Sequence, residues 1–547
     1  MPVPKIKFKS DAVVDSSFSP QNLVNLLLEN RGILGQDKQA FLAPPSPTSE
    51  SIGLKLQKAD RLIRQAIKGN LPILIYGDYD VDGITATALL WQALTKLRAN
   101  VYPFIPDRQT DGYGFKADSF LRVQRQKNLI FRLLITVDNG IVAQPEFNRL
   151  KSQKLQILVV DHHLPGHPKL KVNAKVHSTK LAASGLAWFL ANRFTKTADQ
   201  GLAALGTVAD SMPLTGVNRN LVFHGLNSLR VNPNPGLKKL IETCGLKPDS
   251  LSAYDLGFVL GPRINAVGRL SNPTDALRLI CCQNPRQASQ FAATLNSFNQ
   301  DRQQLQSYML DLTKVIQKQQ SDQNKLVFVS HSKFHPGVIG LIASRLTDEY
   351  YLPSVIISEA ENIAKGSCRS IPEINIIEVL REYSDLFVDL GGHAAAAGFS
   401  IESKNIPILK KKLTSHLNLM LQSHDQTPSI EVDSLMKLSA VTLKNIYALQ
   451  SLEPFGLGNP KPLFLFKNLK IISKRIIGSS FDHLKLKLDD PLTPSVENIG
   501  TDAIAFRMAE LTEKLVVGQS VDLIAQISSN TWNGTTFPQL VVSKILL

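Results

Sequence analysis

Residues 71–83 read Leu71-Pro72-Ile73-Leu74-Ile75-Tyr76-Gly77-Asp78-Tyr79-Asp80-Val81-Asp82-Gly83, a short apolar strand that runs into a loop of aspartates. A stretch with helical character, residues 84–97, follows this loop. Further apolar strands are predicted at residues 101–105, 133–137 and 157–160. Apolar strands that alternate with helices are typical of a parallel sheet covered on both faces. The first part of the chain is therefore predicted to be an α/β domain.

Polar residues follow each of these four strands. They are Asp78, Asp80 and Asp82 after the first strand, Asp107 and Arg108 after the second, Asp138 and Asn139 after the third, and Asp161, His162 and His163 after the fourth. The carboxyl ends of parallel strands share one edge of the sheet, and ligands bind at that edge. The sequence thus predicts one site built from four distant segments.

This set of side chains predicts a metal centre. Carboxylates prefer hard divalent cations, and imidazole shifts the preference toward transition metals. A mixed Asp and His site suits manganese, or alternatively magnesium, and two such ions can activate a water that attacks a phosphoester. Asp210 ends another apolar stretch without an obvious local partner, and we expect it to join the site.

Each motif also has a structural interpretation. The aspartate loop resembles part of a calcium loop, but Leu89 stands where an EF-hand loop requires Glu. A lone Asp after a strand is usually a helix cap or a turn residue, and a His pair can be structural. The convergence of all four segments favours the catalytic interpretation.

Composition sets the broader limits. A chain of 547 residues predicts two to four domains. No apolar run is long enough for a membrane span, and the four cysteines form no CxxC. These features predict a soluble, cytoplasmic protein of a reducing compartment. The net charge of +15 suits nucleic acid, although a basic surface without a polyanionic partner explains the charge equally well.

The four site segments resemble the motifs of the DHH phosphoesterase family, in the family's order. The matching residues are 78–83, 136–140, 161–163 and 209–210, and Tyr76 stands where many members have His. Other segments resemble the RecJ branch of that family: residues 105–108 with 111–114, 261–266 with 268–270, 391–398, and 452–456 with 458–460. The resemblance extends over about residues 50–547.

The resemblance implies a metal-dependent exonuclease that degrades single-stranded DNA from 5′ to 3′ into 5′-mononucleotides, in DNA repair and recombination. The ligands of the two ions, manganese or magnesium, would be Asp80, Asp82, Asp138, His162 and Asp210, with Asp78, Asp161 and His163 completing the catalytic site. The substrate-binding residues would be Arg108, Arg263, Asn265, Ser367, Arg369 and His393. Arg108, Ser367 and Arg369 would anchor the 5′-phosphate. A single-strand-binding protein and a helicase are expected partners.

The predicted architecture has five parts. They are an N-terminal segment (1–50) without an assigned function, a DHH catalytic domain (51–215), a helical connector (216–324), a second α/β, DHH-associated domain (325–425) and a C-terminal OB-fold β-barrel (430–547). An apolar stripe predicts one long connecting helix over residues 286–319. Glycine-rich segments at 365–370 and 391–393 are predicted to be turns that approach phosphate.

Five strands are predicted in the C-terminal barrel, at residues 464–477, 483–488, 503–506, 521–527 and 540–547. An OB-fold commonly binds single strands through basic and aromatic side chains. The candidates for that surface are Lys470, Lys474, Arg475, Lys485, Lys487 and Trp532, although each taken alone is explained equally by a solvated strand face.

Three alternatives compete with an exonuclease. A DHH phosphodiesterase or pyrophosphatase would act on short oligonucleotides, cyclic dinucleotides or polyphosphate, and the long chain and barrel argue against it. A non-catalytic DNA-binding scaffold would not need the convergent acids. A Rossmann-type oxidoreductase would need a GxGxxG after the first strand, and the sequence has none there.

Overall fold

Five parallel strands form the sheet of the first α/β domain. The computed structural model describes residues 4–108, 110–166, 169–318, 324–422, 429–491 and 500–546. The strand order is β4-β3-β5-β6-β7. The strands are β3 (Ile73–Tyr76), β4 (Val101–Phe104), β5 (Leu133–Val137), β6 (Gln156–Asp161) and β7 (Ala174–His177). The four strands predicted from the sequence are confirmed, with shifts of no more than two residues.

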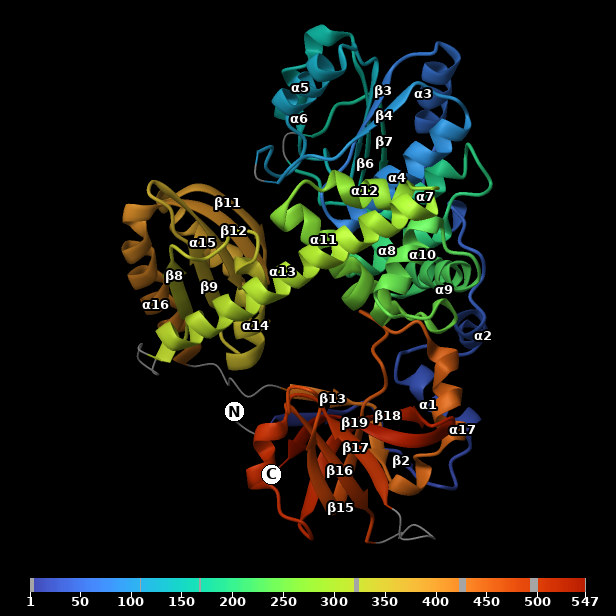
Figure 1. Ribbon diagram of the computed structural model, residues 1–547, viewed down its shortest axis with the longest axis vertical. Coiled ribbons are helices and arrows are strands. Elements are labelled where there is room, and N and C mark those ends of the chain that lie inside the picture. The colour runs from blue at the N-terminus through green and yellow to red at the C-terminus, as the bar shows by residue number, and fades with distance from the viewer. Residues whose placement is uncertain are drawn as a thin grey trace.

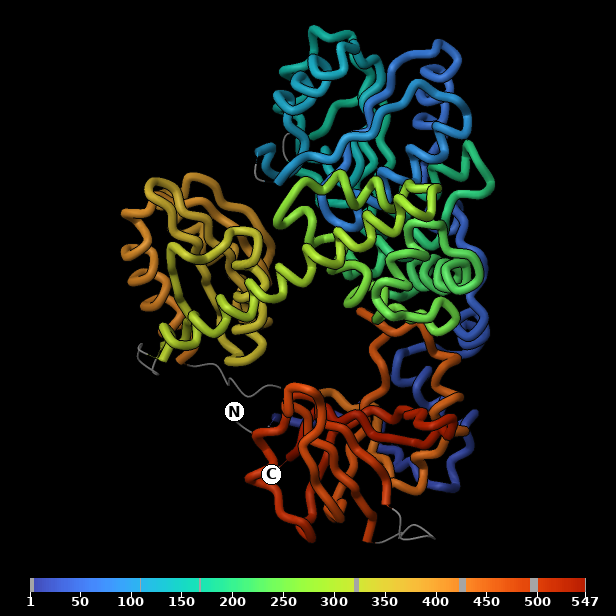
Figure 2. Tube along the Cα trace, viewed as in Figure 1, coloured from blue at the N-terminus to red at the C-terminus, as the bar shows by residue number. Residues whose placement is uncertain are grey.

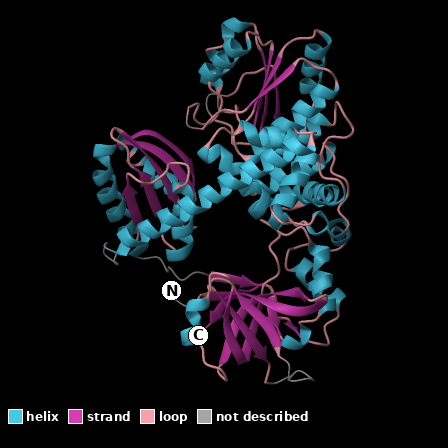
Figure 3. Cartoon of the chain, in the orientation of Figure 1, coloured by secondary structure: helices cyan, strands magenta, loops and turns pink. Residues whose placement is uncertain are grey.

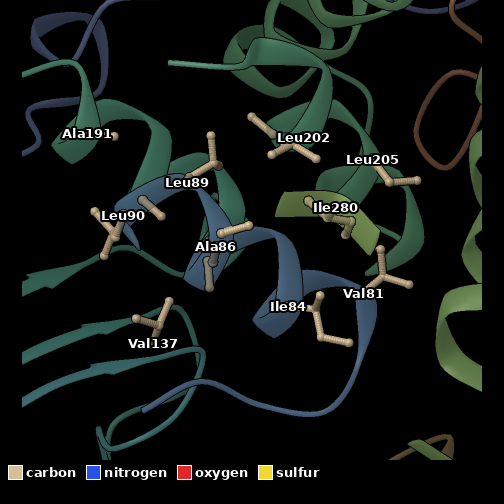
Figure 4. Close-up of a cluster of buried hydrophobic side chains, with 14 of the residues drawn as sticks. Val81, Ile84, Ala86, Leu89, Leu90, Val137, Ala191, Leu202, Leu205 and Ile280 are labelled. Carbon is tan, nitrogen blue, oxygen red and sulfur yellow. The ribbon is translucent and has the colours of Figure 1, made fainter. Parts of the chain in front are cut away.

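Helices cover both faces of this sheet (Figure 1). They are α3 (Gln57–Lys68), α4 (Val81–Lys96), α5 (Ala117–Lys127), α6 (Gln144–Asn148) and α7 (Ala183–Ala191). Helix α4 is buried on nearly every side. Its core also contains Val137 of β5, Leu202 and Leu205 of α8 (Gln200–Ala209) and Ile280 of α12 (Thr274–Cys281) (Figure 4). The packing holds the aspartate loop at the start of α4 in one place.

A helical region follows, and one long helix leads out of it. The region comprises α8 (Gln200–Ala209), α9 (Gly216–Val231), α10 (Pro235–Thr243), α11 (Gly261–Leu270) and α12 (Thr274–Cys281). Helix α13 (Pro285–Lys318) has 34 residues and is therefore about 50 Å long. It confirms the predicted connecting helix, and in Figure 2 the second α/β domain lies at its far end.

The second α/β domain has a mixed sheet in the order β11-β12-β10-β9-β8. Its elements are β8 (Val327–His331), α14 (Ile339–Tyr350), β9 (Ser354–Ser358), β10 (Ile363–Arg369), α15 (Ile376–Arg381), β11 (Phe387–His393), β12 (Ala396–Glu402) and α16 (Ile406–Gln422). The two predicted glycine-rich turns are wrong, because they are parts of β10 and β11. Gly366 is required there by packing: a Cβ would lie 2.0 Å from the ring of Phe399.

The C-terminal strands close into a five-stranded barrel (Figure 3). The barrel strands are β15 (Phe464–Ile477), β16 (His483–Asp489), β17 (Thr501–Ala505), β18 (Ser520–Trp532) and β19 (Thr535–Leu546). All five predicted strands are confirmed in their core residues; residue 547 lies outside the described part. Their apolar faces form a single buried cluster.

The N-terminal segment is built into this barrel domain, which the sequence did not indicate. Its elements are β1 (Lys5–Phe8), β2 (Val13–Val14), α1 (Pro20–Glu29) and α2 (Asp37–Leu42), and their partners include β13 (Ser429–Val432), β14 (Ser434–Met436) and α17 (Leu443–Leu449). Strand β1 pairs in parallel with β13, and β2 pairs in parallel with β14. Across the described residues, no helix combines the length and the apolar character that crossing a membrane requires.

Candidate active site

The acidic residues converge at the switch point of the first sheet. Strands β3 and β5 are neighbours, but the chain leads from β3 to β4 on one side and from β5 to β6 on the other, which opens a crevice between their carboxyl ends. Asp78 and Asp80 follow β3, and Asp138 follows β5. Asn139 donates hydrogen bonds of 2.9 Å to the carbonyls of Gly77 and Val137, and these bonds tie the two loops together.

Helix termini orient two of the carboxylates. Asp80 is the N-cap of α4, and its Oδ1 accepts a hydrogen bond of 3.0 Å from the backbone N–H of Gly83. The Asp82 carboxylate accepts hydrogen bonds of 2.6 and 2.9 Å from the N–H groups of Ala183 and Ser184, at the start of α7. The oxygens of Asp82 are therefore held in position by the positive end of a neighbouring helix.

His162 lies at the centre of the acids. Its Nε2 is 3.2 Å from Asp138 Oδ1 and 3.9 Å from Asp82 Oδ2, and its Nδ1 is 3.6 Å from Asp210 Oδ2. Asp138 is 2% exposed, and no hydrogen-bond donor in the described structure satisfies its Oδ1. A buried carboxylate oxygen without a donor fits a position where a cation binds.

Three groups of residues have the geometry of metal ligands. In each group the ligand atoms lie within 4.8 Å of one another. The groups are Asp78, Asp80 and Asp138; Asp82, His162 and Asp210; and Asp138, His162 and His163. The structure thus brings together all five predicted ligands, and it places Asp78 and His163 at ligand distance as well. The mixture of carboxylates and imidazoles fits divalent manganese or magnesium.

The electrostatics of the cluster are those of a site short of positive charge. Burial, followed by repulsion from Asp82 and Asp80, raises the pKa of Asp138 well above its usual value. Burial and Asp80 raise the pKa of Asp78 to about 8, and burial with Asp82 raises that of Asp210 to about 8. Burial lowers the pKa of His162, which favours the neutral imidazole that a metal requires.

His163 is held by a chain of hydrogen bonds. Its Nδ1 lies 2.8 Å from Asp161 Oδ1, and its Nε2 lies 3.0 Å from the hydroxyl of Tyr113. Asp161 also accepts a hydrogen bond of 2.8 Å from the N–H of Ile141. Tyr113 was not among the predicted site residues. It lies in the 111–114 segment that resembles the RecJ branch, and the glycines on either side of it, Gly112 and Gly114, both have φ +76°.

A second cluster, of arginines, lies between the two α/β domains. Burial, followed by repulsion from Arg108, lowers the pKa of Arg269 to about 10, and Arg369 contributes to the same effect. Arg369 donates hydrogen bonds to Ser367 Oγ (3.2 Å) and the Cys368 carbonyl (2.8 Å). Ser367 and Arg369 lie against Gly340 in the first turn of α14, whose N–H groups add positive potential. Arg269 is a member that the predicted site did not include.

The other predicted substrate residues have different surroundings. His393 lies at the end of β11 and lines a pocket of about 460 Å³ together with Tyr113, Asp161 and His163 of the first domain. Asn265 accepts a hydrogen bond of 3.0 Å from the N–H of Val81, so it supports the aspartate loop.

Two of the barrel candidates are bonded to protein groups. Lys474 Nζ donates to the carbonyls of Thr512 and Leu515, and Lys485 pairs with Asp502. The other barrel candidates are at least partly exposed: Lys470, Arg475, Lys487 and Trp532.

Three family descriptions match this chain. The DHH family, N-terminal domain, matches residues 72–210, the DHHA1 domain matches residues 322–419, and the RecJ OB domain matches residues 432–544.

Two curated relatives and one solved structure extend over most of the chain. The single-stranded-DNA-specific exonuclease RecJ of Bacillus subtilis is 36% identical over 90% of this chain, which spans 63% of that relative's length. The protein of the same name from Thermus thermophilus is 31% identical over 88% of this chain and 69% of its own length. A crystal structure of Thermus thermophilus RecJ in complex with Mn²⁺ superimposes with a TM-score of 0.82 at 27% identity, covering 99% of this chain and 80% of that one.

Proposed function

This chain belongs to the RecJ family, and on that premise we propose that it is a metal-dependent exonuclease that degrades single-stranded DNA from the 5′ end. The observation that carries the proposal is the group of acids and histidines around Asp138 and His162, where three sets of ligand atoms share one crevice. The Mn²⁺ bound by the Thermus thermophilus protein supports the same chemistry here.

Two divalent ions, manganese or magnesium, would be held by Asp80, Asp82, Asp138, His162 and Asp210, with Asp78 close enough to take part. His163 also lies at ligand distance, but it would bind an ion only by giving up one of its two hydrogen bonds. The ions supply Lewis-acid activation of a water and neutralise charge on the phosphodiester. The remaining protein groups orient this site. Asp161 and Tyr113 fix the two ring nitrogens of His163, so its ring keeps one orientation toward the crevice.

The arginine cluster supports recognition of a 5′-phosphate. A guanidinium binds phosphate through two parallel hydrogen bonds, which a lysine cannot do. Arg108 comes from the first domain, and Ser367 and Arg369 come from the second, so the terminal phosphate would bridge the two domains. Anchoring the end beside the metal centre makes a mononucleotide the expected product. His393 is proposed to contact the terminal nucleotide, because it lines the pocket beside His163.

The remaining substrate contacts are proposed on α11 and on the barrel. Arg263 and Asn265 are proposed to act on the strand at the rim formed by α11. The barrel is proposed to hold the trailing strand through Lys470, Arg475, Lys487 and Trp532. A role in DNA repair and recombination, with a single-strand-binding protein and a helicase as partners in the cytoplasm, remains a prediction.

The experiment that tests the proposed function uses single-stranded DNA labelled at the 5′ or the 3′ end. Purified protein is incubated with each DNA with Mn²⁺, with Mg²⁺ and with EDTA. The expected result is early release of a labelled mononucleotide from the 5′ end, gradual shortening of the 3′-labelled strand, and no reaction in EDTA. Release from the 3′ end first, or hydrolysis of dinucleotides with none of long strands, would contradict the proposal.

A further inference from the structure

Two exposed aromatic side chains stack on each other beside the metal centre. Tyr254 and Phe258 have ring centroids 4.9 Å apart and ring planes 23° from parallel. Tyr254 is 65% exposed and Phe258 is 70% exposed. Other aromatic pairs of the described residues meet edge-on or tilted. Single exposed rings are common on protein surfaces, but two that stack on each other form a continuous apolar face of the kind that ligands cover.

Phe258 lies in a π-helix, Asp255–Leu260, that leads directly into α11, and Tyr254 immediately precedes that helix. This π-helix packs against the segments that carry the metal ligands. A Cβ on Gly257 would lie 3.2 Å from Val208, and one on Gly261 would lie 3.6 Å from Ala209 and 3.9 Å from Val81. Those neighbours adjoin Asp210 and the aspartate loop in the chain. The two rings therefore lie on a side of the helix that is roughly a quarter of a turn away from the side that packs against the metal centre.

Positive charge accompanies the two rings. The guanidinium of Arg263 reaches back along the helix and donates a hydrogen bond of 2.7 Å to the carbonyl of Val259, next to Phe258. Its other bond, of 3.0 Å, goes to the neutral side chain of Asn296. Within the described part of the chain no carboxylate forms an ion pair with Arg263, so its charge is available to a phosphate. Exposed rings beside such a cation match a single strand, which offers both bases and phosphates.

We propose that Tyr254 and Phe258 form a platform on which bases of the single strand stack as the strand leaves the metal centre, with Arg263 beside the adjoining phosphate. The identity of the ligand rests on the proposed function. Every base has a π-face, so the platform holds the strand without selecting its sequence. Its effect is on retention of the strand between successive cleavages.

The test measures binding of a 5′-phosphorylated oligothymidylate of about twelve nucleotides by fluorescence anisotropy, in EDTA so that no hydrolysis occurs. A series of otherwise identical strands carries one abasic position each. With the wild type, an abasic position at one site or two neighbouring sites should weaken binding about tenfold, the size expected for one stacked base. Phe258→Ala should weaken binding of the intact strand by a similar factor and remove the sensitivity to those positions.

Controls separate stacking from damage to the fold. Phe258→Trp keeps a ring and should keep both the affinity and the position-dependent sensitivity. Val231→Ala removes another exposed apolar side chain, 86% exposed on α9, and should bind as the wild type does. Thermal unfolding of all variants checks that they fold.

Two outcomes would overturn the platform: Phe258→Ala binding the intact strand as tightly as the wild type, or the variant showing the same abasic profile as the wild type. Unchanged binding by Phe258→Ala would indicate that a protein partner, rather than DNA, covers the two rings. Hydrolysis by the wild type is measured separately with Mn²⁺. A wild type that shows the abasic profile but cleaves no DNA would refute the proposed function and leave the platform standing.

Discussion

Two regions of this molecule bury charge, and they do so in opposite ways. The metal centre collects Asp78, Asp80, Asp82, Asp138 and Asp210 around two histidines, and Asp138 Oδ1 has no hydrogen-bond donor. The second region is a joint at Arg219 of α9, which is 1% exposed. Its guanidinium donates to the carbonyls of Phe41, Leu452, Glu453 and Pro454, and it stacks 3.6 Å from the centre of the Phe41 ring.

The contrast distinguishes two uses of buried charge. The charge of Arg219 stabilises the fold, whereas the charges of the metal centre are available to bind a ligand. A buried charge is tolerated when its hydrogen bonds are complete, and the bonds of Arg219 join the helical region, the N-terminal segment and the barrel domain. The carboxylates of the metal centre repel one another, and this repulsion is relieved by protonation or by an added cation. We therefore expect the repulsion to lower the stability of the metal-free protein, and a bound cation to restore it.

The largest expected effect is on hydrolysis. Asp138→Ala and Asp82→Ala each remove a proposed ligand of the ions. Turnover should fall by about three orders of magnitude, because several kcal/mol of charge stabilisation in the transition state would be lost. Release of mononucleotides from end-labelled DNA measures the loss, and EDTA should reproduce it reversibly. Asp118→Ala, on the surface beside Arg149, is the matched control and should keep full activity. Near-normal turnover in either ligand variant would remove the metal centre from the reaction.

The second effect concerns stability and tests the joint. Arg219→Ala leaves the carbonyls of Phe41 and Glu453 without a donor, whereas those of Leu452 and Pro454 still accept from Asn459. At about 1–3 kcal/mol for each carbonyl left without a donor, we expect a total loss of about 3 kcal/mol. Urea unfolding measures it, and limited proteolysis should show earlier cleavage between the helical region and the barrel. Arg230→Ala on the same helix serves as the comparison, because Arg230 is 30% exposed and donates to the single carbonyl of Leu251. Equal stability of the two variants would contradict the structural role of Arg219.

The third effect concerns Arg369, whose charge is compensated less completely than that of Arg219 but more completely than the carboxylates of the metal centre. Arg369 is only partly satisfied, by Ser367 and a carbonyl, as expected of a charge that awaits a phosphate. Arg369→Ala should reduce the preference for 5′-phosphorylated over 5′-hydroxyl DNA by a factor of about ten to one hundred, since hydrogen bonds to charged groups contribute about 1.5–3 kcal/mol. The ratio of the two initial rates measures this. Arg381→Ala, exposed on α15, should leave the ratio unchanged, and an unchanged ratio in Arg369→Ala would exclude it from the pocket.

The smallest effect is a gain in stability. The folded pKa of Asp78, raised to about 8 by burial and Asp80, exceeds the unfolded value near 4, so the folded state holds a proton that the unfolded state releases. Metal-free protein should therefore lose stability as the pH rises from about 4 to 8. Asp78→Asn should reduce that loss, which Asp138 and Asp210 share, and raise stability at pH 8 by about 1 kcal/mol. Thermal unfolding in EDTA at pH 5 and pH 8 measures both. A less stable variant under these conditions would contradict the assigned repulsion.

Local patterns in the chain were sufficient for much of the fold. The apolar strands of the first sheet, the long helix α13 and the barrel strands follow from periodicity, because each side chain's face is set within its own element. The ligand types of the metal centre followed from a topological rule: residues after parallel strands meet at one edge. The glycine segments of β10 and β11 were wrongly predicted to be turns. Gly366 is part of a strand, where the absence of a side chain leaves room for the ring of Phe399 on a neighbouring strand.

The sequence by itself determined the apolar and polar pattern of the strands and helices. It also determined which segments carry acids and which edge of the sheet these acids share. Only the tertiary structure decided the contacts between distant segments. Asn30 donates a hydrogen bond of 2.9 Å to the carbonyl of Asp433, β1 pairs with β13, and Arg219 joins three parts of the chain. Arg269 and Tyr113 enter their clusters in the same way. No local periodicity encodes such pairs, because their partners lie tens to hundreds of residues away and meet only when the domains pack.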